Sequence, residues 1–391
     1  MTLCASCARY TASRLLRSGA RQGHHPFEQR ALDVAVIGAP NAGKSLLTNQ
    51  LIKAAVSAVS SKMDTTTSNN EAIITEDDVQ LVVIDSPGTV GLKHAREFAG
   101  RKYQEQILSD PEAAITKAQH VLVVQDATQT GDYIHHRVLH MLHRNEHIPS
   151  SLVFNKVDLV SDRSELLELT RILTNGQVAG EKIKVASNTI GRLGNTFDKL
   201  KLHAIDTKND DPEWMAKYRR TIAKPTHICP YKETKHLFMD IRGWSNFSAV
   251  FFASALTGEG IQPLRNHLKT LAEKREWRMD PSAVTTKRPQ DICAESVRGA
   301  LLDVLPSDLA YNLQPKVSEW NQDGEVLQIV VDIPCKTERI AKLIIGKSGG
   351  SRIIEIGQRV NDHLATLFQR QLFVRILVKH QGKIVNFSPS R

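Results

Sequence analysis

The chain has 391 residues, of which 41% are hydrophobic and 24% charged, and its formal net charge is +9. This composition is typical of a folded protein of two or three domains, and it excludes wholesale disorder and a collagen-like fibre. No stretch approaches the roughly eighteen consecutive apolar residues of a membrane-spanning helix. The cysteines, 5 in all and widely scattered, are too few for a disulfide scaffold and favour a reducing compartment.

The positive charge lies at the two ends of the chain. Residues 1–31 carry five arginines against one glutamate, and residues 336–391 carry eleven basic and three acidic side chains. The middle of the chain is therefore mildly acidic, with a net charge of −3.

The amino-terminal segment is typical of a mitochondrial transit peptide. It is rich in Arg, Ser, Thr and Ala, contains an amphipathic stretch at residues 12–17, and lacks the apolar run of a secretory signal. We expect residues 1–31 to be this transit peptide, and the alternative is a disordered basic tail. Cys4 and Cys7 have the spacing of a redox or zinc pair, but no second pair of ligands lies nearby, so we attribute the spacing to chance.

A phosphate-binding loop is predicted near the start of the folded chain. An apolar strand at residues 32–37 runs into Gly-Ala-Pro-Asn-Ala-Gly-Lys-Ser at residues 38–45, and a helical pattern follows. This is the strand, G-x-x-x-x-G-K-S and helix order that the motif requires. Glycines let backbone N–H groups surround a phosphate, and the helix start adds its dipole. We predict nucleotide contacts from Gly38, Asn41, Ala42, Gly43, Lys44 and Ser45, with Lys44 on the β- and γ-phosphates and Ser45 on Mg²⁺.

A second strand, residues 151–154, ends in Asn155-Lys156-Val157-Asp158, which predicts guanine as the base. The Asp158 carboxylate can accept hydrogen bonds from the N1–H and 2-amino groups of guanine, which adenine does not offer. Asn155 and Lys156 are expected to brace the loop and cover the ring. Ser254 and Ala255 follow a further apolar strand, and their backbone N–H groups are expected to meet the guanine oxygen.

Two segments are predicted to sense the nucleotide state. The strand at residues 79–84 ends in Asp85-Ser86-Pro87-Gly88, where Asp85 would hold Mg²⁺ through water and the Gly88 N–H would sense the γ-phosphate. The hydroxyl-rich residues 64–67 are a candidate first switch, in which Thr66 is predicted to contact Mg²⁺, with Thr65 as the alternative. The expected Mg²⁺ ligands are therefore Ser45, Thr66 and Asp85.

Hydrolysis is expected to be slow, because no glutamine follows Gly88 to orient the attacking water. Asn41 is a candidate ligand for K⁺, which would stand in for a cationic finger. The residues predicted to act in catalysis are Lys44, Asn41, Thr66 and Gly88.

The basic carboxyl-terminal region is predicted to bind RNA. Its pattern is α-β-β-α-α-β, with helices at 289–305, 337–343 and 350–368 and strands at 316–320, 326–333 and 372–378. A G-x-x-G loop between two helices lets a single-stranded backbone approach main-chain N–H groups, as in a KH module. The predicted RNA contacts are Gly346, Lys347, Ser348, Gly349 and Arg352. The alternatives are a basic solvated helix pair with a capping glycine, or an anionic membrane as partner.

Together these motifs resemble the Era family of GTPases. The shared patterns are G-x-P-N-x-G-K-S, T-T, D-x-P-G, N-K-x-D and S-A-L-x-G-x-G, followed by R-P-x-x-I-x-A-E-x-x-R at residues 288–298. The fold that the resemblance implies is a P-loop GTPase domain with a doubly wound, mostly parallel α/β sheet, followed by an α+β type II KH domain. Ala42 and Thr67 depart from the family pattern, which has Val and Arg there.

With the basic leader, the chain is similar to the mitochondrial members of that family. The resemblance implies binding near the 3′ end of small-subunit ribosomal RNA and a role in assembly of the small ribosomal subunit. It also implies residence in the mitochondrial matrix, a monomeric state off the ribosome and a peripheral association with the inner membrane. The alternative function is an RNA-binding KH protein whose GTPase domain is structural or very slow.

The expected domains are a GTPase domain at 32–280, a KH domain at 288–380 and a tail at 381–391. Asp158 and Ser254 are 96 residues apart, more than one helix and two loops require, so an insertion is expected within about 177–244. A disordered or partner-contacting surface loop is its default interpretation. The histidines between 135 and 147 are predicted to lie on a solvated helix, in preference to a metal site.

Overall fold

The computed structural model describes residues 28–57, 68–89, 108–128, 132–183, 211–323, 326–346, 350–368 and 371–385. Most of the expected transit peptide therefore lies outside the described residues. The same holds for Thr65, Thr66 and Thr67 of the first switch, for Lys347, Ser348 and Gly349 of the G-x-x-G loop, and for most of the tail. None of the helices in the described part of the chain is long and apolar enough to span a membrane.

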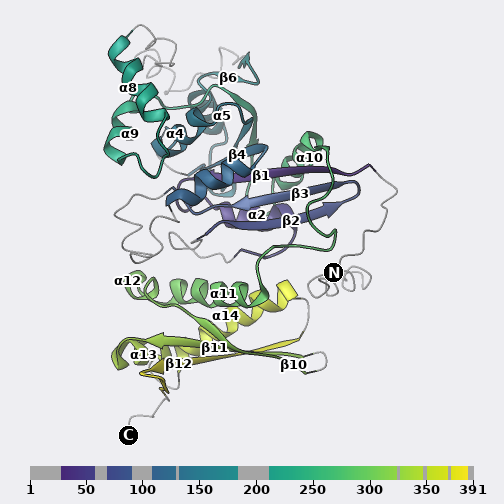
Figure 1. Ribbon diagram of the computed structural model, residues 1–391, viewed down its shortest axis with the longest axis vertical. Coiled ribbons are helices and arrows are strands. Elements are labelled where there is room, and N and C mark those ends of the chain that lie inside the picture. Colours follow the sequence, from purple (N-terminus) through teal and green to yellow (C-terminus); the bar gives the residue numbers. More distant parts are fainter. Residues whose placement is uncertain are drawn as a thin grey trace.

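The first domain is built on a mostly parallel sheet with the strand order β2-β3-β1-β4-β5-β8 (Figure 1). The strands are β1 (Arg30–Gly38), β2 (Asn70–Glu76), β3 (Val79–Asp85), β4 (His120–Asp126), β5 (Ser150–Asn155) and β8 (Phe247–Phe252). Only β2 and the short β9 (Glu273–Lys274), which pairs with the start of β1, run antiparallel in this sheet as described. Continuous apolar runs suit strands that are buried on both faces, so the predicted doubly wound α/β fold is confirmed.

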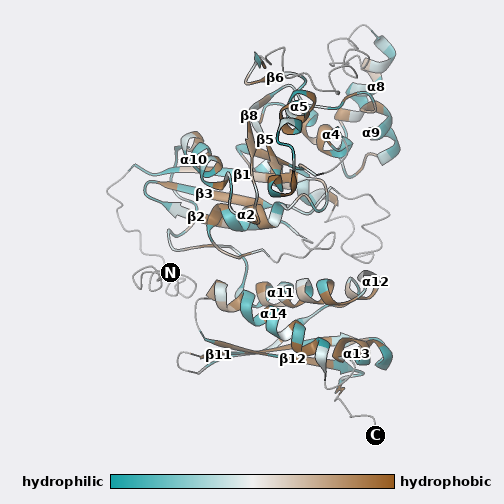
Figure 2. Ribbon diagram, turned by 180° about the vertical axis from the view of Figure 1, so that it is seen from behind, coloured by the Kyte–Doolittle hydropathy of each residue, from teal (hydrophilic) through white to brown (hydrophobic). Residues whose placement is uncertain are grey.

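Helices cover both faces of this sheet. Leu32, Val34 and Val36 of β1 pack with α2 (Lys44–Ile52) and α10 (Ile261–Leu271). The alternate residues, Ala35 and Ile37, pack with α4 (His136–Arg144) and α5 (Ser164–Leu173). Figure 2 shows the hydrophobic colour concentrated on the central strands that lie between these helices.

The region expected to be an insertion is partly folded. It contains β6 (Gln177–Val178), β7 (Glu181–Lys182), α8 (Pro212–Ile222) and α9 (Tyr231–Leu237), and residues 184–210 lie outside the described part. Leu237, Phe238 and Trp244 are buried in the same core cluster as the residues of α4. The default interpretation as a surface loop is therefore wrong for residues 211–244.

The predicted solvated helix is α4, and it is not solvated. His136, His140 and His143 are 7%, 0% and 6% exposed, because α8, α9 and the chain after α9 cover this face. His143 lies between the rings of Phe238 and Trp244. Their burial and ring contacts make these histidines part of a core.

The second domain has the predicted α-β-β-α-α-β order. Its elements are α11 (Pro289–Val304), α12 (Ser307–Ala310), β10 (Lys316–Asp323), β11 (Val326–Cys335), α13 (Glu338–Ile345), α14 (Ser351–Phe368), β12 (Leu372–His380) and β13 (Lys383–Ile384). The sheet order is β10-β11-β12-β13, with β11 and β12 parallel. Two elements were not predicted, the single turn α12 and the short strand β13, which forms after a turn at Gln381 and Gly382.

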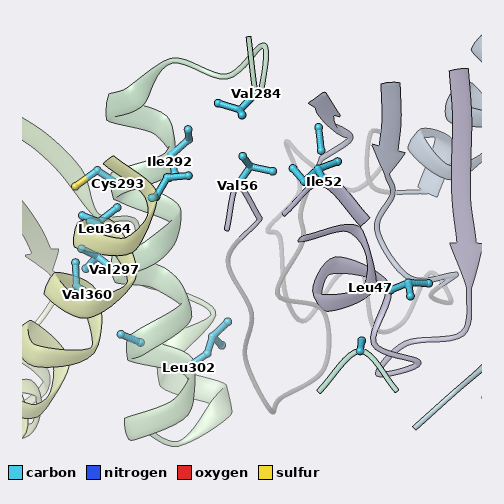
Figure 3. Packing of buried hydrophobic residues seen from close by; sticks show 14 of the residues in the cluster. Leu47, Ile52, Val56, Val284, Ile292, Cys293, Val297, Leu302, Val360 and Leu364 are labelled. Carbon is cyan, nitrogen blue, oxygen red and sulfur yellow. The ribbon is translucent and has the colours of Figure 1, made fainter. Parts of the chain in front are cut away.

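The two domains share a hydrophobic core. In Figure 3, Val56 of the first domain lies opposite Ile292 of α11, with Val284 of the connecting segment above them. That connecting segment is bonded to the sheet, because Ile73 N of β2 donates to Val284 O at 2.9 Å and Ala72 forms a bridge with Thr285. The connecting segment thus joins the KH domain to β2, the strand that follows the candidate first switch in sequence.

Candidate active site

The phosphate loop has the backbone that its glycines were predicted to provide. Gly43 has a φ of 85°, in the left-handed region, and begins α2. A Cβ added at Gly43 would collide with Asn155 Nδ2, so both conformation and space require glycine there. Asn41 also has a positive φ, of 60°, which asparagine tolerates better than most residues. The loop therefore turns sharply and directs the N-terminus of α2 toward the carboxyl ends of the parallel strands.

Lys44 points back into this loop. Its side chain is buried, and Nζ donates to Ala39 O at 2.9 Å and lies 3.4 Å from Gly38 O. The ammonium group thus sits at the concave side of the turn, where phosphate oxygens could replace these carbonyls as acceptors. This position fits the predicted role of Lys44.

Asp85 is fully buried at the end of β3, and neither carboxylate oxygen has a hydrogen-bond partner of normal geometry among the described residues. Burial raises its pKa above the usual value, while the hydroxyls of Ser45 and Ser57 and the charge of Lys44 act in the opposite direction. The raised pKa means that these groups offset only part of the cost of burying the charge, and a bound cation or a proton would neutralise the rest. The donor set of Asp85 and Ser45 is all oxygen, which fits Mg²⁺.

Asn155 joins the two halves of the predicted nucleotide site. Its Nδ2 donates to Ala42 O of the phosphate loop at 2.8 Å, and its Oδ1 accepts from Ala255 N at 2.9 Å. Lys156 follows in a left-handed conformation with a φ of 67° and pairs with Asp126 Oδ2 at 2.6 Å. Asp158 lies in a single 3₁₀ turn, Val157–Leu159, and its side chain is exposed. The expected bracing role of Asn155 is thus present in the geometry.

The loop at Ser254 and Ala255 is less open than the sequence suggested. Ser254 N donates to Glu259 O at 2.9 Å, and Ala255 N is used by Asn155. A guanine oxygen could be bound there only by sharing or displacing the Ala255 bond. The position beside Asn155 agrees with the prediction, whereas free N–H groups do not occur at these two residues.

The segment that begins with the D-x-P-G motif at Asp85, called the second switch below, is described as far as Thr89. Ser86 Oγ donates to Val36 O at 2.6 Å, and Thr89 N donates to Gly38 O at 3.2 Å, so Ser86 within the D-x-P-G motif and Thr89 directly after it are both bonded to β1. Gly88 has no room for a side chain, since a Cβ there would lie 2.9 Å from Pro40 Cα. The Gly88 backbone therefore lies close against the phosphate loop, a position compatible with the predicted contact to a γ-phosphate.

At the predicted RNA loop, only the two flanks are described. Gly346 ends α13 with a φ of 91°, and a Cβ there would lie 2.9 Å from Arg352 N. Arg352 Nη1 donates to Leu343 O at 3.0 Å and so ties α14 back to α13. The close approach of the two helix ends explains the glycine requirement at Gly346 and shows that Arg352 also has a structural contact.

Three supporting residues were missed by the sequence analysis. Asp126 holds Lys156, and Ser57 lies beside Asp85. Arg265 of α10 donates to Leu51 O at 2.7 Å and to Gln50 O at 2.6 Å, and so satisfies the carboxyl end of α2. Arg265 is 214 residues from Leu51, so no local pattern could have indicated the pairing.

Comparison with known proteins adds an independent line of evidence. Residues 33–156 match the family described as "50S ribosome-binding GTPase". The chain is 52% identical over 363 residues to the protein named "GTPase Era, mitochondrial" of Caenorhabditis elegans, covering 92% of each chain. It is 32% identical to the protein of the same name from Danio rerio, covering 90% of this chain and 76% of that one.

Among solved structures, one similar fold is that of Era in complex with MgGDPNP and nucleotides 1506–1542 of 16S ribosomal RNA. The TM-score is 0.61 at 19% identity, covering 90% of this chain and 94% of that one. A likeness at this identity supports the fold alone, including the order of the two domains.

Proposed function

Because this chain belongs to the Era family of GTPases, we propose that it is a mitochondrial GTPase whose KH domain binds small-subunit ribosomal RNA during assembly of the small ribosomal subunit. The observation that carries the nucleotide part is the position of Asn155, which ties the phosphate loop to the loop of Ala255. On the other side of the phosphate-loop strand β1, strand β3 ends in the fully buried carboxylate of Asp85. A structural relic would have no reason to keep such a carboxylate buried.

The proposed GTP site consists of residues already predicted from the motifs. Gly38, Asn41, Ala42, Gly43 and Lys44 hold the phosphates, and Asn155, Lys156, Asp158, Ser254 and Ala255 hold the base. Ser45, Thr66 and Asp85 hold Mg²⁺, which neutralises phosphate charge when bound. Gly88 senses the γ-phosphate. Lys44 and Asp85 are the two whose buried geometry supports the assignment most directly.

Slow hydrolysis is part of the proposal, because Thr89 occupies the position after Gly88 where a glutamine would orient water. Asn41 is exposed at the rim of the phosphate loop and is proposed as a K⁺ ligand. Turnover that is equal in potassium and in sodium would exclude this role.

The proposed RNA site is the G-x-x-G loop with Gly346, Lys347, Ser348, Gly349 and Arg352. The helix ends that frame it approach closely at Gly346, and the net charge of +8 after residue 335 favours a polyanion. The related Era structure contains nucleotides 1506–1542 of 16S ribosomal RNA, which supports a 3′-terminal rRNA segment as the ligand class.

The domain boundaries and the cellular location complete the proposal. Two of the expected boundaries are corrected by the strands: Arg30 and Ala31 belong to β1 and not to the leader, and β13 pairs with β12 and so belongs to the KH sheet and not to a tail. We therefore propose a transit peptide that ends before Arg30, a GTPase domain at 30–280, a KH domain at 288–385 and a tail after residue 385. The matrix is the proposed compartment, since a basic leader and mitochondrially named relatives agree. A monomeric state off the ribosome and a peripheral association with the inner membrane are further proposals.

The test is crosslinking and sequencing of bound RNA with and without a non-hydrolysable GTP analogue. We expect crosslinks concentrated near the 3′ end of small-subunit rRNA, with an occupancy that depends on the nucleotide. The matched control is Lys44→Ala, which should remove the dependence on nucleotide and leave the KH domain intact. A diffuse RNA profile that ignores the nucleotide would contradict the proposal.

A further inference from the structure

Thr89 is held at three points next to the γ-phosphate sensor. Its backbone N–H donates to Gly38 O at 3.2 Å, its hydroxyl lies 3.5 Å from the same oxygen, and the hydroxyl also lies 3.2 Å from His135 Nδ1. The residue is only 6% exposed. Because Thr89 directly follows Gly88, these contacts limit the directions in which the Gly88 N–H can point.

His135 is the residue from which α4 starts, and its ring is fixed on two sides. Its backbone oxygen accepts from Val138 N at 2.7 Å, which places it at the first turn of the helix. The ring stacks on Tyr231, with centroids 5.9 Å apart and planes at 16°. Burial, and then the neighbouring charges of His136 and Arg137, lower the pKa of His135 to about 4, so the ring is neutral at physiological pH and can share one hydrogen bond with a hydroxyl.

Tyr231 brings the folded insertion into this arrangement. It is the first residue of α9, and the guanidinium of Arg137 lies 5.9 Å from its ring centroid. A small pocket next to the second switch is lined by Gly88 and Thr89 on one side, and by Arg137 of α4 and Thr226 of the insertion on the other. The insertion therefore lines the same pocket as Gly88 and Thr89 at Thr226, and it reaches Thr89 through Tyr231 and His135.

We propose that His135, braced by Tyr231 of the insertion, is a positioning residue that holds Thr89 and so keeps the Gly88 N–H in place for the γ-phosphate. Through this contact the insertion has a function in GTP hydrolysis. The contact stabilises the segment after Gly88, where the chain has no glutamine. It rests on the nucleotide site proposed above. His135 does not touch the phosphates and acts only through Thr89.

The arrangement predicts a selective effect on the triphosphate. GDP has no γ-phosphate, so a freer Gly88 leaves its affinity unchanged. In a variant without the His135 contact, GTP binding must order the backbone of Gly88 and Thr89. In the wild type this backbone is already held, so GTP binding costs less conformational entropy there. Loss of one hydrogen bond of this kind corresponds to about a five-fold change in an equilibrium constant.

The experiment measures the affinities of the full chain for GDP and for a non-hydrolysable GTP analogue, together with kcat for GTP. Thr89→Val removes the hydroxyl at constant shape, and His135→Phe removes the hydrogen bond but keeps the stack on Tyr231. We expect each substitution to weaken binding of the analogue about five-fold and to change GDP affinity by no more than about two-fold. We expect kcat for GTP to fall about five-fold as well. Tyr231→Ala should act in the same direction with a smaller effect.

Matched controls separate positioning from simple damage. Thr89→Ser and Tyr231→Phe keep the hydroxyl and the ring, so both should retain the ratio of the two affinities. Equal weakening of GDP and analogue, or an unchanged ratio in Thr89→Val and His135→Phe, would overturn the inference. Lys44→Ala should lose affinity for both GDP and the analogue. If it binds both normally, the proposed nucleotide site is wrong, whatever the role of His135.

Discussion

His363 of α14 is hydrogen-bonded to Ala55 O across the domain interface, with an Nε2 to O distance of 3.0 Å. The opposite nitrogen, Nδ1, lies 2.7 Å from Ser296 Oγ of α11. A carbonyl can only accept, so Nε2 is the donor, and in the neutral ring Nδ1 accepts from the Ser296 hydroxyl. Burial lowers the pKa of His363 and favours this neutral form.

This contact lies close to Asp85, the proposed Mg²⁺ ligand. Ala55 is two residues from Ser57, whose backbone N–H and C=O are both bonded to the side chain of Asn49 at 2.9 and 2.8 Å. The Ser57 hydroxyl in turn lies beside Asp85. A short run of fixed contacts therefore joins the proposed Mg²⁺ ligand to the helix that follows the G-x-x-G loop.

The first prediction is that His363 carries part of the coupling between nucleotide and RNA. His363→Ala should bring the factor by which a GTP analogue changes RNA affinity closer to one, because the link between Ala55 and α14 is lost. The measurement is RNA affinity in the presence of GDP and of the analogue. His363→Gln can still donate to Ala55 O and is the control, and an unchanged factor in the alanine variant would exclude the role.

The second prediction concerns acid stability. Burial, and then the charge of His140, lower the pKa of His143 to about 3, so protonation favours the unfolded chain. The stability that depends on neutral His143 is complete above pH 6.5 and falls as the pH drops below this, by about 1.4 kcal/mol per pH unit. His143→Phe should make the free energy of unfolding less dependent on pH by about one proton between pH 6.5 and 5. Urea titrations at several pH values measure this free energy. If it depended on pH equally in both proteins, the prediction would be wrong.

The features that the sequence predicts well are those that depend on residues close together in the chain. The phosphate loop, D-x-P-G and N-K-x-D all lie at the ends of the strands predicted to precede them, because each motif depends on a local backbone requirement such as the left-handed Gly43. The burial of α4 was not predictable, because the atoms that cover it are distant in sequence. His140 Nε2, for example, is bonded to Thr221 O at 3.0 Å, 81 residues away. The polar face of α4 therefore predicts a solvated helix, whereas α8, α9 and the rings of Phe238 and Trp244 cover it.

The third prediction uses two glycines with similar dihedral angles. Gly43→Ala adds a Cβ that would collide with Asn155 Nδ2, in addition to the cost of a φ of 85°. Gly176→Ala, at a φ of 72°, meets nothing within 4 Å and should cost only about 1 kcal/mol of backbone strain. We therefore expect Gly43→Ala to lose nucleotide affinity at least about ten-fold and Gly176→Ala to bind normally. Isothermal titration with GDP measures both, and equal effects would contradict the argument.

The fourth prediction tests the base. Asp158→Asn replaces an acceptor pair by one acceptor and one donor, which no longer matches the two donors of guanine but matches xanthine, whose 2-position carries an oxygen. GTP affinity should fall roughly 100-fold and xanthosine triphosphate affinity should rise. Because Asp158 is exposed, the fold should be unaffected. If the variant still prefers GTP as the wild type does, Asp158 does not contact the base.

The last prediction concerns RNA and salt. Arg352 lies beside the G-x-x-G loop, and a phosphate contact from it should contribute to the salt dependence of RNA binding. Arg352→Gln should lower the slope of log affinity against log salt by about 0.7, as expected for one single-strand phosphate contact. Lys53→Gln is the control, since Lys53 is an exposed base of the GTPase domain that pairs with Glu76 at 2.6 Å. Arg352 also bonds Leu343 O, so thermal stability is measured alongside. A slope that falls equally in both variants would show that the RNA is not confined to the KH domain.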